Sequence, residues 1–296
     1  MSEAKILYIE AGDGISGDMT LGALIDLGVD VAEIKNELNK FVKDSYDIIA
    51  NPFERNGIKG TNLEVVVDFE EYEYDHSYDY RHPHEHEHEP SHNVGFEEFV
   101  DDHSHDFRTP HESEPKTEHS HNKYSDIVKM IEDSDIAEGA KKYALDIFSV
   151  IADAEAHVHG MSKEEIAFHE VGAMDSIIDI VGTAIAIDML GVDEVYCGKL
   201  HDGSGTVLCR HGLIPVPVPA VMAMMKDSDL PIVIDEDVNT EMITPTGFGI
   251  LKGLCAKFEP HFGFYAHKIG YGFGKRDTGR LGAVRITLGT KYNEED

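Results

Sequence analysis

The sequence predicts a mixed α/β fold in which mixed sheets pack against helices and a histidine-rich insert interrupts the chain. Short apolar runs of strand length alternate with segments whose apolar residues recur at helical spacing. Residues 70–121, in contrast, show no apolar periodicity and contain four prolines, which oppose helices and strands. We therefore expect one folded unit made of residues 1–69 and 124–290, a disordered insert at 70–123, and a tail at 291–296.

The first region carries signals for one strand, two helices and a hairpin. A short apolar run predicts a strand at 5–10, followed by a glycine-rich turn and a helix at 19–27. A second helix is expected at 31–41. Asn56–Gly57 separates two β-prone runs, at 47–55 and 61–69, and this dipeptide is a strong hairpin signal.

After the insert the pattern is first helical and then mixed. Ser125 is expected to cap a short helix, and a long apolar stripe predicts a second helix that Gly160 ends. Ser176 is expected to begin the next helix, and Thr244–Pro245 a later one with proline at its first position. The remaining predicted elements are helices at 140–159, 176–190, 221–226 and 244–257 and strands at 194–200, 206–210, 232–234, 261–269 and 284–288.

Charge and cysteine content exclude several protein classes. The formal net charge of −32 disfavours a general affinity for nucleic acid backbones, since no basic patch could neutralise phosphates. No apolar run approaches the roughly 20 residues of a membrane span, and the first residues lack a signal-peptide pattern. The three cysteines form no C-x-x-C pair or disulfide framework. We expect a cytoplasmic protein without a membrane partner.

The insert is the most distinctive part of the chain. Residues 68–121 hold eleven of the eighteen histidines and seventeen Asp or Glu residues. Imidazole and carboxylate tracts of this kind bind divalent metals, and neutral imidazole favours Ni and Zn over Mg or Ca. The candidate ligands are His82, His84, His86 and His88. The alternative interpretation is a solvated acidic linker.

Two glycine-containing turns are candidates for binding a phosphate. Gly12, Gly14 and Gly17 match the spacing of a dinucleotide fingerprint between a strand and a helix. The predicted hairpin and the acidic Asp18 disfavour a nicotinamide or flavin, so a phosphate or metal–nucleotide site at the helix start is the preferred reading, with Asp18 holding a cation. A structural tight turn is the alternative.

The start of the helix at Thr244 offers a second anion site, because Thr246 and Gly247 supply a hydroxyl and a backbone N–H. An ordinary helix cap is the alternative. The glycine-rich segment before Lys275–Arg276 is a further candidate for a phosphate contact.

Histidines and acids also cluster within the folded sequence. Glu155 and His159 share a helix face, His157 lies between them, and Asp175 shares a face with Asp179. Such groups bind borderline metals or transfer protons. Helix caps and surface polar groups would show the same pattern.

His201 and His211 flank another glycine-rich turn, with Cys209 between them. Two imidazoles and a thiol could bind a soft metal. A structural role for each residue is the alternative.

Five motifs together resemble a known family. In chain order they are Gly14-Ile-Ser-Gly-Asp-Met19, Ala154-Glu-Ala-x-Val-His-Gly160, Phe168-His-Glu-Val-Gly-Ala-x-Asp-Ser-Ile177, His211-Gly-x-x-Pro-Val-Pro217 and Thr244-Pro-Thr-Gly247. They resemble the nickel-insertion proteins of nickel-pincer cofactor biosynthesis, the LarC family. The likeness runs from about Lys5 to Leu288. The chain departs from the family pattern at Gly12–Asp13 and at Ala167.

The resemblance implies an activity. Family members insert Ni²⁺ into pyridinium-3,5-bisthiocarboxylic acid mononucleotide, a lyase-type nickel chelatase reaction that consumes CTP with Mg²⁺ or Mn²⁺. The product is accepted by a nickel-pincer apo-enzyme. We expect Asp296 to lie about where the family's CTP-binding second half begins, so the chain would be the N-terminal part of the active enzyme. A homo-oligomer is one assembly that the sequence allows.

The resemblance and the residue chemistry together give three sets of candidate residues. The catalytic candidates are His159, His169, Glu170 and Asp175. The substrate-binding and cofactor-binding candidates are Gly14, Ser16, Gly17, Asp18, Thr244, Thr246 and Gly247. The candidate nickel ligands are, besides the insert, His157, His159, His169, His201 and His211. Two other functions stay open, namely nickel storage or delivery without catalysis, and a different nucleotide-binding enzyme.

Overall fold

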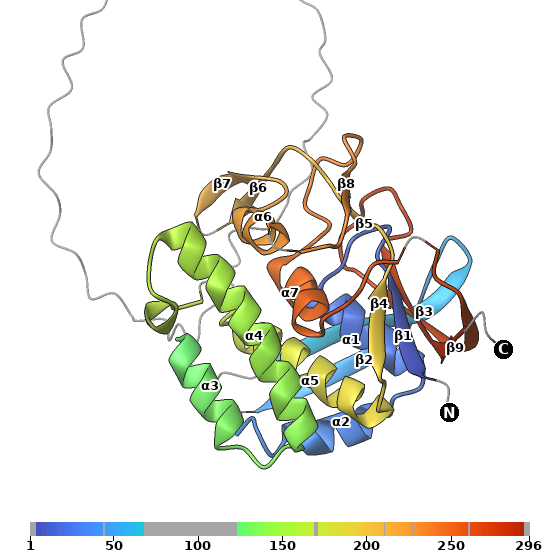
Figure 1. Cartoon of the computed structure of the whole chain (residues 1–296), viewed down its shortest axis with the longest axis horizontal. Coiled ribbons are helices and arrows are strands. Elements are labelled where there is room, and N and C mark those ends of the chain that lie inside the picture. The colour runs from blue at the N-terminus through green and yellow to red at the C-terminus, as the bar shows by residue number, and fades with distance from the viewer. Residues whose placement is uncertain are drawn as a thin grey trace, which may run out of the picture. The chain divides into compact units, whose positions relative to one another are not determined.

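A six-stranded mixed sheet, in which the two ends of the chain meet, forms one layer of the computed structural model (Figure 1). Its strands, in spatial order, are β2 (Tyr46–Arg55), β3 (Ile58–Val67), β9 (Phe264–Phe273), β10 (Ala283–Lys291), β1 (Lys5–Glu10) and β4 (Glu194–Cys197). Neighbouring strands are antiparallel except for β3–β9 and β1–β4, which are parallel. Strands from both sides of the insert therefore pair directly, and the predicted mixed α/β class is confirmed.

The structure describes residues 4–43, 45–67, 123–168, 171–209, 211–226, 228–259 and 261–292. The predictions for the insert, including His82, His84, His86 and His88, lie outside these residues, and so do those for His169 and Glu170.

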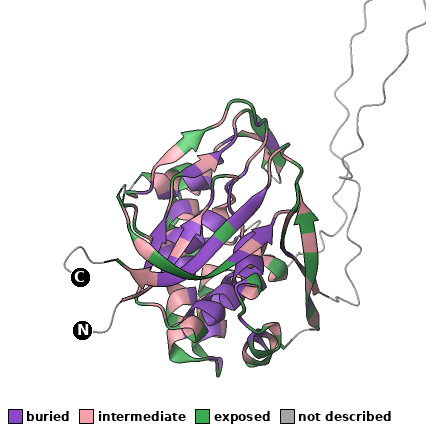
Figure 2. Ribbon diagram, turned by 90° about the vertical axis from the view of Figure 1, so that its right-hand side faces the viewer, coloured by how far each residue is buried: buried purple, intermediate pink, exposed green. Residues whose placement is uncertain are grey.

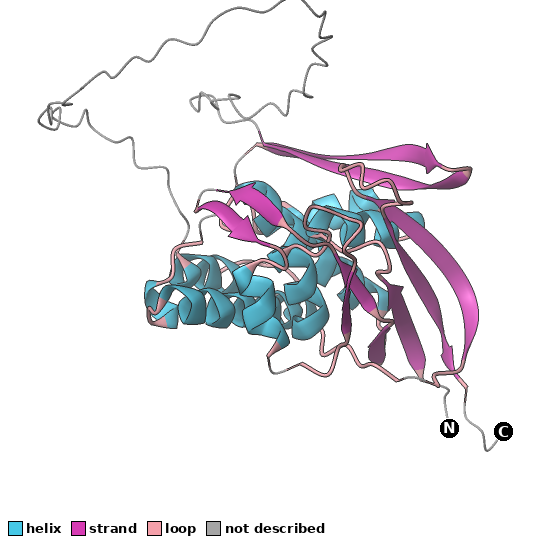
Figure 3. Cartoon of the chain, turned by 90° about the horizontal axis from the view of Figure 1, so that it is seen from above, coloured by secondary structure: helices cyan, strands magenta, loops and turns pink. Residues whose placement is uncertain are grey.

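Helices cover one side of this sheet in successive layers (Figure 3). They are α1 (Gly17–Asp26), α2 (Val31–Leu38), α3 (Tyr124–Glu132), α4 (Glu138–His159), α5 (Met174–Leu190), α6 (Pro219–Met225) and α7 (Pro245–Gly253), with a short 3-10 turn at Lys163–Glu165. Helix α1 packs directly on β3, β9 and β10. Helix α5 packs on α1, and α4 packs on α5, α6 and α7.

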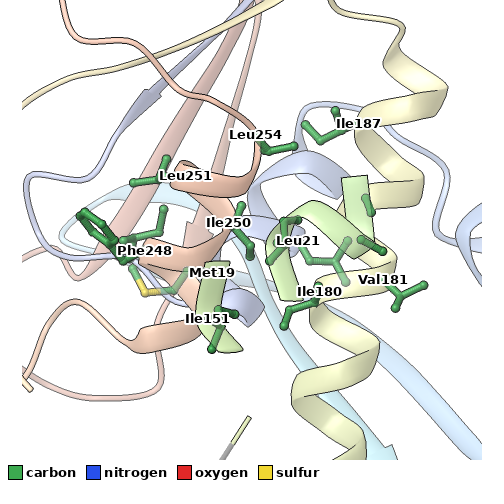
Figure 4. Packing of buried hydrophobic residues seen from close by; sticks show 14 of the residues in the cluster. Met19, Leu21, Ile151, Ile180, Val181, Ile187, Phe248, Ile250, Leu251 and Leu254 are labelled. Carbon is green, nitrogen blue, oxygen red and sulfur yellow. The ribbon is translucent and has the colours of Figure 1, made fainter. Parts of the chain in front are cut away.

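The core lies between these layers. Figure 2 shows buried residues concentrated where the helices face the sheet and one another. In Figure 4, Leu21 of α1, Ile151 of α4, Ile180 of α5 and Ile250 of α7 pack together, and all four are fully buried. Burying a side chain of this size contributes roughly 1.5–3 kcal/mol. The core therefore fixes α1, α5 and α7 relative to one another.

Two small sheets complete the described structure. Strands β5 (Leu200–Asp202) and β8 (Ile232–Ile234) are parallel, while β6 (Thr206–Cys209) and β7 (Gly212–Pro215) form a hairpin. The single strand expected at 194–200 is instead two strands, β4 and β5, in different sheets. Strand β7 was not predicted.

Two predicted helix starts were wrong, and the predicted hairpin was confirmed. Helix α3 begins before Ser125, and Lys123 occupies its N-cap without a side-chain bond. Helix α5 begins at Met174 rather than Ser176, which places Asp175 in its first turn. The Asn56–Gly57 hairpin is present, with φ of 54° and 79° at the two residues.

Strand β9 extends further than predicted, through glycines that were expected to form a loop. Gly272 lies in the strand beneath α1, and a Cβ built there would lie 1.8 Å from the carbonyl oxygen of Met19. Glycine at this position lets the helix backbone approach the sheet backbone closely. The described helices include none that is both long enough and apolar enough to cross a membrane.

Candidate functional site

The turn before α1 is shaped by its caps. The Ser16 hydroxyl accepts a hydrogen bond from the backbone N–H of Met19 at 3.4 Å, and Asp18 Oδ1 accepts from the same N–H at 2.9 Å. The Ser16 hydroxyl also donates to Asp18 Oδ1. Because Ser16 is the N-cap, the helix begins at Gly17, earlier than the sequence suggested.

This turn contacts the segment that leads into α7. Ile15 donates its N–H to the Met242 carbonyl at 2.9 Å, and Thr244 donates its N–H to the Ile15 carbonyl at 3.0 Å. Gly14 has φ of +90° and lies where a Cβ would be 2.2 Å from the Met242 oxygen. A Cβ on Gly247 would be 2.3 Å from the Ile15 oxygen. Gly14 and Gly247 therefore permit the close contact between the two predicted anion-binding turns.

Asp202 holds the second of these segments in place. The residue is fully buried, and its Oδ1 accepts backbone N–H bonds from Gly203 at 2.9 Å, Met242 at 2.7 Å and Ile243 at 3.1 Å. Burial raises the pKa of Asp202, and the three backbone hydrogen bonds oppose that rise. The candidate residues did not include Asp202, because its role depends on contacts forty residues away in the sequence.

The first turns of α1, α5 and α7 surround one cavity of about 250 Å³. Residues 16–18 line it from α1, Asp175 and Asp179 from α5, and residues 244–246 from α7. Five of the seven predicted substrate-binding residues, Ser16, Gly17, Asp18, Thr244 and Thr246, thus share one cavity with the catalytic candidate Asp175. Gly14 and Gly247 lie behind it.

The cavity combines opposing electrostatic features. Each helix N-terminus carries about half a positive charge and presents backbone N–H groups. Four carboxyl groups also line the cavity, from Asp18, Asp175, Asp179 and Glu241, with the ammonium of Lys275. Arg276 Nη2 lies 2.8 Å from Glu241 Oε1. The sequence predicted a phosphate contact at Lys275, whereas it did not indicate Glu241 as a residue of the site.

Asp179 is the most enclosed of these carboxyl groups. The residue retains some surface toward the cavity, but its Oδ1 is buried and has no hydrogen-bond partner. Burial raises the pKa of Asp179 well above its usual range, and the charges of Asp18 and Asp175 raise it further. Lys275 acts in the opposite direction. A buried carboxyl group of this kind holds its proton to higher pH than an ordinary aspartate.

A second cluster joins two groups that the sequence placed separately. The rings of His159, at the end of α4, and His211, before β7, have centroids 5.0 Å apart and are inclined by 35°. His159 Nε2 lies 3.3 Å from Glu155 Oε2, and Cys209 Sγ lies 3.9 Å from His211 Nδ1. Imidazole, carboxylate and sulfur are ligand types that a borderline metal such as nickel accepts, but these side chains are not arranged as a group of three or more ligands.

The two remaining predicted nickel ligands that the structure describes, His157 and His201, lie on different elements, α4 and β5. His157 is exposed on α4. His201 Nδ1 lies 2.9 Å from Asp235 Oδ2, which also accepts from Arg280 at 2.8 Å. The hydrogen bond from His201, with a smaller contribution from Arg280, lowers the pKa of Asp235. Among the described residues, no group of three or more His, Cys, Asp or Glu side chains is arranged to hold a metal ion.

Comparisons with known proteins find similarity to nickel insertion proteins. Residues 7–296 match the family model described as nickel insertion protein. A relative in Acetivibrio thermocellus, named pyridinium-3,5-bisthiocarboxylic acid mononucleotide nickel insertion protein, is 42% identical over 98% of this chain and 62% of its own length. A protein of the same name in Lactiplantibacillus plantarum is 41% identical over 96% of this chain and 61% of its own length. The chain thus spans about three fifths of the length of these relatives. No solved structure matches it.

Proposed function

This chain belongs to the nickel insertion protein family, and from that premise we propose that it inserts Ni²⁺ into pyridinium-3,5-bisthiocarboxylic acid mononucleotide. The observation that carries the proposal is the convergence of three family-like motifs on one cavity. The motifs around Ser16, Asp175 and Thr244 are far apart in the sequence, yet each supplies the first turn of a helix at that cavity. Three helix N-termini at one point suit the anionic phosphate of a mononucleotide.

The phosphate group would lie at these helix starts. Backbone N–H groups of the first turns, the hydroxyl of Thr246 and the ammonium of Lys275 would donate to its oxygens. Asp18 shares Oδ1 with the cap of α1, which leaves Oδ2 to orient a bridging cation if one accompanies the phosphate.

The nickel would reach the substrate through imidazole ligands. The His159–His211 pair, with Cys209 and Glu155 close by, supports a transient site for Ni²⁺ as cargo. Imidazole and carboxylate ligands exchange more readily than a full thiolate set, which suits an ion that must be released. We propose His157, His169 and His201 as further candidate ligands that bind Ni²⁺ before it reaches the substrate.

Formation of the nickel–carbon bond must release one proton. The ring C–H bond breaks, its electron pair forms the Ni–C bond, and nickel stays divalent while a base takes the proton. His159, His169, Glu170 and Asp175 are our candidates for that base, because neutral imidazole and carboxylate accept protons near pH 7. Two Ni–S bonds to the thiocarboxylates complete the product.

The rest of the reaction would need parts beyond this chain. The use of CTP with Mg²⁺ or Mn²⁺ would belong to the further two fifths that the relatives possess. In this proposal the chain is the N-terminal part of a lyase-type nickel chelatase, and a nickel-pincer apo-enzyme accepts the product.

Calorimetric titration with the mononucleotide tests the substrate site. Lys275→Gln should weaken binding by roughly tenfold, since a charge-assisted hydrogen bond is worth about 1.5–3 kcal/mol. The matched control is Lys199→Gln, an exposed lysine that does not line the cavity, and it should bind like wild type. Equal affinities for all three proteins would contradict binding of the mononucleotide in this cavity.

A further inference from the structure

We propose that Asp179 is a proton-carrying hydrogen-bond donor in the cavity, which in its neutral form donates to a tetrahedral oxyanion bound at the starts of α1, α5 and α7. The proposal deepens the mononucleotide site proposed above and rests on it for the identity of the natural ligand. It follows that the cavity binds the oxyanion when the Asp179 carboxyl group carries its proton.

The position of the carboxyl group is the first support. Asp179 lines the cavity from the second turn of α5, while its Oδ1 is buried without a hydrogen-bond partner. Buried polar atoms are nearly always paired, so each unpaired one requires an explanation, and this oxygen is one of five such side-chain oxygens among the described residues. Gly17 packs so closely that a Cβ there would lie 2.8 Å from Asp179 Cβ and 3.0 Å from Oδ2. The side chain is thus confined between α1 and the cavity.

The surrounding charges are the second support. Asp18 faces the group from α1, Asp175 lies on the same helix, Glu241 lines the cavity from the loop before α7, and Lys275 follows β9. Glu241 forms an ion pair with Arg276, and Lys275 contributes a positive charge to the lining of the cavity. An additional charge on Asp179 would therefore lie among like charges in a poorly hydrated position. Burial, then Asp18 and Asp175, raise the pKa of Asp179 accordingly.

The neutral and the ionised forms of Asp179 differ in their hydrogen bonding to an oxyanion. A neutral carboxyl group donates one O–H bond, while a carboxylate only accepts. The oxygens of sulfate or of a phosphate ester accept. The neutral form would therefore complete the donors at the helix starts, and the ionised form would repel the ligand. Affinity should fall as pH rises through the pKa of Asp179, by at most tenfold for each pH unit.

Sulfate titrations of the full chain between pH 5 and 9 test the coupling, because sulfate keeps its charge over that range. For wild type we expect affinity to decline with pH. Asp179→Asn should bind sulfate with no such decline, since its amide N–H donates at every pH. Asp179→Ala should bind at least tenfold more weakly than wild type at low pH. Asp188→Asn, the matched control at the other end of α5, should follow wild type.

A direct view of the proton comes from infrared spectroscopy of the carboxyl groups. Wild type should show a protonated carboxyl band well above the pH at which ordinary aspartates ionise, and Asp179→Asn should lack it. Asp18→Asn should move its midpoint to lower pH, because a neighbouring negative charge has been removed.

Three results would overturn the proposal. They are a wild-type protein that does not bind sulfate, an affinity independent of pH, and an Asp179→Asn variant that keeps the wild-type decline. None of these involves nickel or cofactor formation, so the proposed nickel insertion could stand without the proton coupling. Conversely, pH-coupled sulfate binding without mononucleotide binding would remove the proposed substrate and leave the oxyanion site.

Discussion

Gly17 lies where the start of α1 meets both other helices of the cavity. A Cβ at this position would be 2.8 Å from Asp179 Cβ and 2.9 Å from Thr246 Cγ2. We predict that Gly17→Ala destabilises the protein by about 1–3 kcal/mol, the usual cost of overpacking, and weakens ligand binding in the cavity. Urea unfolding and mononucleotide titration measure the two effects.

Gly12→Ala is the control for that substitution. A Cβ on Gly12 would meet nothing within 4 Å, although it lies in the same turn region. Its effect on stability should stay within about 0.5 kcal/mol. Equal unfolding free energies for the two variants would show that the packing around Gly17 is looser than described.

Asp179 should also give stability a recognisable pH dependence. Because the pKa of Asp179 is raised in the folded state, the folded protein binds its proton more tightly than the unfolded chain does. Its contribution to stability is therefore greatest at low pH and declines as pH rises from about 4 toward the folded pKa. We predict that Asp179→Asn gains stability relative to wild type across that window. Urea unfolding at a series of pH values measures the difference, and a difference that shrinks with rising pH would contradict the assignment.

At the residue scale, positions at helix starts could be predicted from the sequence, whereas contacts between distant segments could not. Ser16, Asp18 and Thr246 were recognisable because a hydroxyl or an acid at a helix start has a chemical meaning within its own segment. Asp202 was not recognisable, because its acceptor role joins segments forty residues apart. The raised pKa of Asp179 likewise depends first on its burial and then on the charge of Asp18 from another helix.

At the scale of elements, the buried Asp202 connects β5 to the segment before α7. Its Oδ1 accepts three backbone N–H bonds, two of them from Met242 and Ile243. We predict that Asp202→Ala costs about 2–4 kcal/mol, since buried donors lose their acceptor. Hydrogen exchange at Met242 and Ile243 should accelerate together with the loss in urea stability. The exposed Asp237→Ala is the control, and a cost no larger than the control's would show that other contacts hold the segment.

Several elements differ from expectation for tertiary reasons. Strand β9 continues through Gly270 and Gly272 because α1 packs directly on the strand backbone there. The pattern of glycines alone could not distinguish that contact from a loop. Strand β7 exists because β6 provides an antiparallel partner, which overrides the low strand preference of its proline.

At the scale of the whole molecule, the central sheet joins segments from both sides of the insert. Thr61 and Asn62 of β3 pair with Gly272 and Phe273 of β9, and β1 lies between β10 and β4. The folded unit therefore does not need the insert to bring its strands together. The sequence predicted the class of fold, whereas the strand order depends on pairings distant in sequence that no local pattern encodes.

Deleting residues 71–121 should separate nickel collection from nickel insertion. We predict that the variant keeps its melting temperature and its insertion rate at excess Ni²⁺ but binds fewer Ni²⁺ ions by calorimetry. In wild type, the extra binding should fade as pH falls through about 6.5, because protons compete for imidazole. Unchanged nickel stoichiometry would remove the metal role of the insert. Loss of insertion even at excess Ni²⁺ would favour a storage or delivery protein without catalysis.

The most direct test of the central claim is nickel insertion itself. The chain would be fused to the remaining two fifths of the Acetivibrio thermocellus relative and supplied with the mononucleotide, Ni²⁺, CTP and Mg²⁺. Mass spectrometry would then follow the nickel-bound mononucleotide. We predict that it forms, and that His169→Ala in a well-folded protein slows its formation at least a hundredfold, as expected for loss of a proton-transfer group. No product from the fusion, under conditions in which the intact relative forms it, would contradict the proposed function.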